Sequence, residues 1–157
     1  MNQSTILLVE DEDHIRMATQ MRVRSMGYQV DTATNGRECL DYLEVQKPDL
    51  VLMDIRMPVM NGLEALDYIR VNPSLSDLPI IIVSASAGDQ PAALGGGANY
   101  FVRKPYRNEI LHQTISACFA LRKVDGMQTS MDHCHVPSPT SLPAHSPSRP
   151  TQNSYAN

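Results

Sequence analysis

Short apolar runs, each closed by polar or acidic residues, recur along the first two thirds of the chain. Three of them, 5–9, 49–54 and 78–84, are too short for a buried helix and carry apolar side chains at most positions. Continuous runs of this length are typical of parallel strands covered on both faces. Two weaker runs, 28–34 and 99–103, predict a partly polar strand near a sheet edge and a short fifth strand.

Between these runs, apolar residues recur at helical spacing. The pattern predicts helices over 12–26, after Asn35-Gly36, after Asn61-Gly62 and over 110–121. Alternation of strand and helix predicts an α/β fold with a doubly wound, five-stranded parallel sheet. The segment between the last two strands differs from the others. An interior proline costs a helix about 3 kcal/mol and an interior glycine about 1 kcal/mol, so Pro91 and the glycines at 95–97 predict a short or irregular fourth helix.

Composition narrows the domain organisation. The 157 residues have room for one sizeable domain, which we expect to span residues 1–123. Residues 124–157 are rich in Pro, Ser and Thr and poor in large apolar side chains, which predicts a disordered tail. The net charge is −4 and the 13 basic residues are scattered, so no nucleic-acid partner is expected. No signal peptide, membrane-spanning run or CxxC motif is evident, which predicts a cytoplasmic chain with no membrane partner.

Residues with charged or hydroxyl side chains stand at the ends of the predicted strands. Glu10 and Asp11 follow the first, Asp54 ends the third, Ser84 ends the fourth and Lys104 follows the fifth. The carboxyl ends of parallel strands meet at one edge, so these groups are expected to lie together. Close carboxylate pairs repel by roughly 4 kcal/mol at an effective dielectric near 20, and Mg²⁺ is the hard cation such oxygens prefer. A hydroxyl and an ammonium opposite them suit phosphoryl oxygens.

The motifs at these positions resemble the receiver domain of two-component response regulators, and are similar to single-domain, chemotaxis-type receivers. The resemblance covers about residues 4–123. It implies a flavodoxin-like sheet with strand order 2-1-3-4-5. The motifs are Leu8-Val9-Glu10-Asp11, the stretch from Met53 to Gly62, Val83-Ser84-Ala85, and Gly97-Ala98 continuing to Phe101 and Lys104-Pro105.

The resemblance assigns roles at the acidic end of the site. Asp54 matches the phosphoacceptor, which takes a phosphoryl group from a histidine kinase or a phosphotransfer protein. Glu10, Asp11 and Asp54, with the backbone carbonyl of Arg56, match the Mg²⁺ site. The family signals through a downstream protein target, and it catalyses only its own phosphorylation and dephosphorylation, so an enzyme with an external product is not expected.

The resemblance also assigns the opposite side of the site. Ser84 and Lys104 match the residues that bind the phosphoryl group, and Phe101 matches the switch aromatic. The family commonly has a cis bond before a proline placed like Pro105. Ser84 replaces the commoner threonine and lacks the β-branch that stiffens the rotamer. Phe101 keeps the bulk of the commoner tyrosine without its hydroxyl.

Two other readings remain open at this point. A pseudo-receiver would keep the fold and act as a binding adaptor without phosphorylation, although the set of phosphoryl-transfer residues argues against it. A phosphatase with an aspartate nucleophile would need a second aspartate two residues after Asp54. Arg56 occupies that position.

Overall fold

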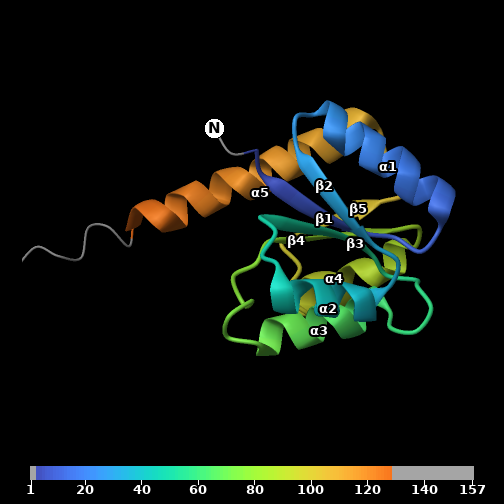
Figure 1. Ribbon diagram of the computed structural model, residues 1–157, viewed down its shortest axis with the longest axis horizontal. Coiled ribbons are helices and arrows are strands. Elements are labelled where there is room, and N and C mark those ends of the chain that lie inside the picture. The colour runs from blue at the N-terminus through green and yellow to red at the C-terminus, as the bar shows by residue number, and fades with distance from the viewer. Residues whose placement is uncertain (1–2, 129–157) are drawn as a thin grey trace, which may run out of the picture.

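Five parallel strands form one sheet with helices on both of its faces (Figure 1). The computed structural model describes residues 3–128. The strand order is β2-β1-β3-β4-β5, which confirms the predicted flavodoxin-like sheet. The strands are β1 (Thr5–Val9), β2 (Gln29–Ala33), β3 (Leu50–Asp54), β4 (Ile80–Ser84) and β5 (Tyr100–Arg103).

Burial along the strands follows their place in the sheet. Every residue of β4 is buried, as its unbroken β-branched run predicts. Strand β2 lies at the edge and exposes Gln29, Asp31 and Thr32. Parallel pairing of β3 with β4 sets Asp54 beside Val83, so the carboxylate of β3 lies next to the end of β4.

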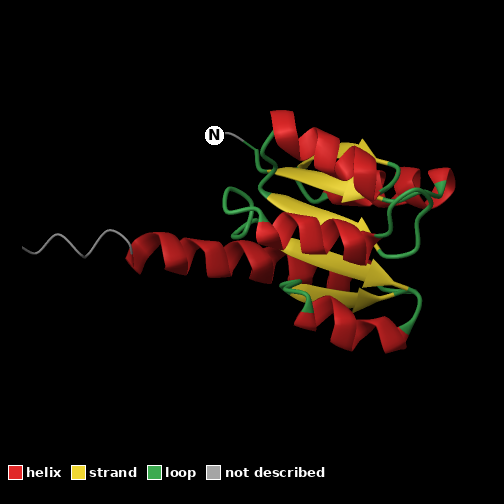
Figure 2. Cartoon of the chain, turned by 90° about the horizontal axis from the view of Figure 1, so that it is seen from below, coloured by secondary structure: helices red, strands yellow, loops and turns green. Residues whose placement is uncertain are grey.

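The helices divide into two layers, as Figure 2 shows from a second direction. Side chains of β1 alternate between the layers: Ile6 and Leu8 pack with residues of α1 and α5, while Leu7 and Val9 pack under α2, α3 and α4. Both faces of the sheet are therefore apolar, and polar side chains concentrate at the strand ends. The helices are α1 (Asp13–Ser25), α2 (Gly36–Val45), α3 (Gly62–Val71), α4 (Gln90–Gly95) and α5 (Asn108–Gln128), with a 3₁₀ turn, η1 (Ala87–Asp89), before α4.

Helix α4 has only six residues, which confirms the prediction of a short fourth helix. The penalty assigned to Pro91 was wrong, however. Pro91 lies in the first turn, where its missing N–H has no intrahelical partner to lose. Gly97, with φ of +96°, follows the helix in a left-handed conformation that favours glycine. These residues therefore define the ends of α4 rather than weaken its interior.

Helix α3 begins directly against the end of β3. The side chain of Asn61 accepts hydrogen bonds from the amides of Leu63 and Glu64, and the Glu64 carboxylate accepts one from the Asn61 amide. This capping box satisfies amides that the first turn leaves unpaired. The amide of Gly62 also donates to the carbonyl of Ile55, which ties the start of α3 to the residue after Asp54.

The end of the described chain lies on α5, which projects beyond the sheet (Figure 1). The helix continues to Gln128, past residue 123, where the domain was expected to end. Residues 124–128 of the predicted tail therefore belong to a helix, while 129–157 lie outside the described residues, so that their disorder stays a prediction. None of the helices within residues 3–128 combines the length and apolar character needed to cross a bilayer. The side chains of Cys39, on α2, and Cys118, on α5, are buried in the two core layers.

Candidate functional site

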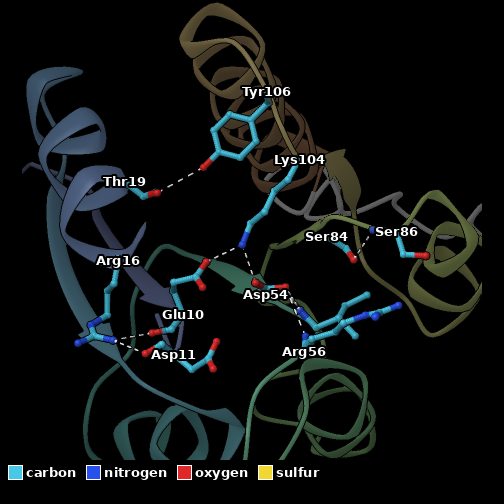
Figure 3. A network of polar contacts seen from close by, with 11 residues as sticks. Glu10, Asp11, Arg16, Thr19, Asp54, Arg56, Ser84, Ser86, Lys104 and Tyr106 are labelled. Atoms are coloured by element: carbon cyan, nitrogen blue, oxygen red, sulfur yellow. Dashed lines mark hydrogen bonds and ion pairs between the residues drawn. The ribbon is translucent and has the colours of Figure 1, made fainter. Parts of the chain in front are cut away.

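Three predicted metal ligands meet at the carboxyl edge of the sheet. Glu10 and Asp11 follow β1, Asp54 ends β3, and one carboxylate oxygen from each lies within 4.8 Å of the others. Parallel pairing of β1 with β3 sets Val9 beside Met53, so the two acidic strand ends are brought level. The three carboxylates therefore lie together, as the ends of the parallel strands predict (Figure 3).

Lys104 joins this group from the end of β5. Its Nζ donates to Asp54 Oδ2 over 2.5 Å and to Glu10 Oε2 over 2.7 Å. Burial on its own lowers the pKa of Lys104, but the hydrogen bonds to Asp54 and Glu10, together with their charges, outweigh it and raise the pKa above 10.5. The ammonium is therefore charged at neutral pH, and it offsets part of the repulsion among the carboxylates.

The Asp54 carboxylate is oriented through both of its oxygens. Oδ1 accepts hydrogen bonds from the amides of Ile55 at 2.6 Å and Arg56 at 3.4 Å, while Oδ2 faces Lys104. The side chain is 12% exposed, so it can be reached from solvent at one edge of the site. A carboxylate held in this way keeps one geometry with little freedom to rotate.

Glu10 is the most buried member of the group. It is 4% exposed, and its Oε1 is buried without a hydrogen-bond partner among the described residues. Burial raises the pKa of Glu10 above 4.5, against the lowering effect of Lys104. An unpaired buried carboxylate oxygen beside two further carboxylates makes a set of hard oxygen donors that fits Mg²⁺.

Arg16, on α1, supports the acidic pair and was not found from the sequence. One of its nitrogens donates to the backbone carbonyls of Glu10, at 2.8 Å, and Asp11, at 3.1 Å, and the guanidinium also pairs with Asp13. These bonds hold the loop that presents Glu10 and Asp11. The only sequence signal was a basic residue soon after the acidic run, which is too common to single out.

Ser84 and Phe101, the other two predicted residues, contact the turn after β4 and the core layer. Ser84 is fully buried, and its hydroxyl donates to Asp89 Oδ2 at 2.7 Å and accepts from the Ser86 amide at 3.2 Å. Phe101 is partly buried and packs on the core layer beneath α2, α3 and α4. Asp89 was not found from the sequence, because its contact depends on the turn geometry of η1.

The loop after β5 completes the site. The bond from Lys104 to Pro105 is cis, as the resemblance implied. Tyr106 follows, and its hydroxyl lies 3.4 Å from Thr19 Oγ1 of α1 (Figure 3). The loop that carries Lys104 is thereby connected to the helix that carries Arg16.

Comparison with known families agrees with this geometry. A family model described as the response regulator receiver domain matches residues 6–116, which is most of the described chain. The chain belongs to the response regulator receiver family. Receiver domains are signalling modules of two-component systems, and the predicted fold and family are confirmed.

Relatives of this receiver include larger regulators. The transcriptional regulatory protein AfsQ1 of Streptomyces coelicolor is 35% identical over 115 residues, which are 72% of this chain and 50% of that protein. The chain thus spans about half the length of the curated relatives it matches. The expected absence of a nucleic-acid partner consequently stays a prediction.

Solved receiver structures include two that contain magnesium. The receiver domain of the sensor histidine kinase PA1611 from Pseudomonas aeruginosa, with a magnesium ion in its active-site cleft, has 30% identity and a TM-score of 0.71, covering 76% of this chain and 99% of that one. The response regulator TrrA from Thermotoga maritima, in complex with Mg²⁺ and BeF, has 30% identity and a TM-score of 0.68, covering 74% and 99%.

Proposed function

We propose that this receiver accepts a phosphoryl group on the Asp54 carboxylate from a histidine kinase or a phosphotransfer protein. The observation that supports this most is that the Asp54 carboxylate is fixed by hydrogen bonds to both of its oxygens. Backbone amides fix one oxygen, Lys104 fixes the other, and two more carboxylates lie within reach of the same point. A protein promotes phosphoryl transfer mainly by positioning the reacting groups and by neutralising their charge.

The reaction proposed is a displacement at phosphorus. An oxygen of Asp54 forms the new bond to phosphorus, the bond from phosphorus to the donor histidine nitrogen breaks, and that nitrogen takes up a proton. Lys104 remains protonated and binds an oxygen of the transferred group, with the Ser84 hydroxyl as the second donor.

The acidic group has a separate role in this proposal. The carboxylates of Glu10, Asp11 and Asp54, with the carbonyl of Arg56, would hold Mg²⁺. Bound there, the ion offsets the negative charge that the phosphoryl group brings to the carboxylates. Arg16 keeps the loop of Glu10 and Asp11 in place while this charge changes.

The output we propose is a protein-protein interaction that depends on the state of Asp54. Phe101 would act as the switch aromatic, because it connects β5 to the core layer beneath α4. The downstream target is a protein whose binding differs between the two states of the receiver.

Labelling with acetyl phosphate and Mg²⁺ tests the proposal. We expect wild type to form an aspartyl phosphate that hydroxylamine removes, and Asp54→Asn to form none. Asp41→Asn, which changes an exposed carboxylate of α2, is the matched control and should label like wild type. No labelling of wild type, from acetyl phosphate or from a panel of phosphorylated histidine kinases, would favour the pseudo-receiver. Turnover of small phosphate esters would instead favour the phosphatase.

A further inference from the structure

The hydroxyl of Ser84 donates its one proton in a hydrogen bond to Asp89. Ser84 is fully buried, its Oγ donates to Asp89 Oδ2 at 2.7 Å, and the amide of Ser86 donates to the same Oγ at 3.2 Å. A serine hydroxyl has one proton to donate. While it donates to Asp89, it cannot donate to a phosphoryl oxygen on Asp54.

Asp89 is placed to make and break this bond. It is half-buried at the end of η1, one residue before α4 begins, and its amide closes the turn by donating to the Ser86 carbonyl at 3.3 Å. Its neighbours Ala87 and Gly88 are exposed. The carboxylate can therefore exchange the hydroxyl for water without leaving a buried charge unpaired.

We propose that Asp89 is a positioning residue that holds the Ser84 hydroxyl away from the phosphoryl site in the unphosphorylated receiver and releases it when Asp54 is phosphorylated. This inference rests on the proposed function, because it takes Ser84 as a ligand of the phosphoryl group. Serine suits such an exchange, since it lacks the second Cβ substituent that restricts χ1 in threonine.

The exchange connects the phosphorylation site to α4. The start of this six-residue helix is held to β4 by the bond between Asp89 and Ser84. Its other end is held from α3, where Arg70 Nε donates to the Gly97 carbonyl at 2.8 Å. Within α4 itself, Ala93 is the buried residue. Breaking the contact of Asp89 therefore frees the start of α4 while its end stays attached.

Binding of beryllium fluoride in the presence of Mg²⁺ measures the competition without a kinase. The anion stands in for the phosphoryl group, so its apparent affinity includes the cost of taking Ser84 from Asp89. We expect Asp89→Ala to bind it about tenfold more tightly than wild type, a change of about 1.4 kcal/mol that is within the range of one hydrogen bond to a charged group. Asp89→Asn keeps an acceptor but loses the charge and should fall between the two.

Controls separate the hydrogen bond from the loss of a negative charge. Asp67→Asn removes an exposed carboxylate from α3 and should change the affinity less than twofold. The decisive variant is the double mutant. If Asp89 acts through the hydroxyl, Asp89→Ala has no effect in a Ser84→Ala background, whereas a general electrostatic effect persists there. Melting curves of each variant establish that it is folded.

The outcomes distinguish this inference from the proposed function. Binding by wild type that Asp89→Ala leaves unchanged or weakens, or a gain that survives in the Ser84→Ala background, overturns the role of Asp89 and leaves phosphorylation of Asp54 standing. Absence of binding by wild type and Asp89→Ala alike overturns both. Amide exchange supplies a second measure, because freeing the first turn of α4 in Asp89→Ala should speed exchange of the Gly96 amide, which donates to the Ala92 carbonyl of that turn, in the absence of beryllium fluoride.

Discussion

Replacing Gly62 with alanine tests how firmly Asp54 is held from the side of α3. A Cβ at this position would lie 2.1 Å from the Asp54 carbonyl oxygen and 3.0 Å from Ile55 Cα. Both are backbone atoms of the central strand and the loop that follows it, so no side-chain rotation can relieve the overlap. Either α3 or the end of β3 has to move.

The expected cost follows from this geometry. Overpacking a tight core costs about 1–3 kcal/mol, and a clash with main-chain atoms belongs at the upper end. Alanine regains at most about 1 kcal/mol through its helix propensity. We therefore expect Gly62→Ala to lower the free energy of unfolding by about 2 kcal/mol or more, and to reduce phosphorylation of the folded fraction, because the carboxylate moves with its backbone.

Gly95→Ala is the matched control. A Cβ at Gly95 has no atom within 4 Å, and its φ is not positive, so alanine should raise the free energy of unfolding by about 0.5–1 kcal/mol. Urea unfolding at constant m-value measures both variants. If Gly62→Ala unfolds within about 0.5 kcal/mol of wild type, then α3 does not fix the position of Asp54, and the reasoning is refuted.

Four further perturbations have definite expected results. Mg²⁺ should stabilise wild type by about 2.7 kcal/mol at a hundredfold excess over Kd and so raise its melting temperature. Asp11→Ala should reduce this rise, and an equal rise in both proteins would contradict the metal site. Val59 has φ of 69° and is exposed, so Val59→Gly should stabilise by up to about 1 kcal/mol in urea unfolding, and a loss would contradict strain there. Burial raises the pKa of the Cys39 thiol from 9.0 to about 12, so its contribution to stability is complete below pH 9.0 and is lost as pH rises toward 12; Cys39→Ala should show a shallower alkaline decline, and an identical one would contradict this. Removing residues 129–157 should leave labelling and melting unchanged, and a large loss of either would show that the tail takes part.

The sheet could be predicted from the sequence because its strands are buried on both faces. Strand β4 is apolar up to its last residue, Ser84, and only its start differs from the prediction, by two residues, Leu78 and Pro79. The edge position of β2 was predictable for the complementary reason, since its exposed positions are polar. Apart from Ser84, the buried positions of both strands carry apolar side chains and the exposed positions of β2 carry polar ones, so the sequence pattern indicates how deeply each strand is buried.

Helix α4 shows where this argument fails. Its short length was predicted correctly, but from costs that apply to helix interiors. Pro91 occupies the first turn and Gly97 the left-handed position after the last, where the same residues are favourable. Proline and glycine destabilise the interior of a helix but are favourable at its ends. The hydrophobic pattern does not show where a short helix begins and ends, so the sequence did not reveal which effect applies.

The site divides in the same way. Topology alone brings Glu10, Asp11, Asp54 and Lys104 together, because parallel strands deliver their ends to one edge. The contact of Asp89 depends on one rotamer of Ser84 and on a three-residue turn, neither of which has a periodic signal in the sequence. Residues that supply charge were therefore predictable, while residues that position them were found only in the structure.

This division corresponds to two different demands on the two sides of Asp54. On one side, the start of α3 packs against the end of β3, and Gly62 leaves no room for the Asp54 backbone to move. On the other side, the proposed phosphoryl ligand Ser84 is held by a half-buried carboxylate at the start of a six-residue helix. A nucleophile needs a fixed geometry, whereas a signal needs an element whose two arrangements differ little in free energy. The nucleophile Asp54 lies on the tightly packed side, and the proposed signalling element, α4, lies on the side with fewer anchoring contacts. A change in charge at Asp54 can therefore alter α4 without moving the Asp54 carboxylate. Gly62→Ala and Asp89→Ala should for this reason differ in kind: the first lowers stability and labelling together, while the second leaves labelling intact and changes how tightly the phosphoryl mimic is held.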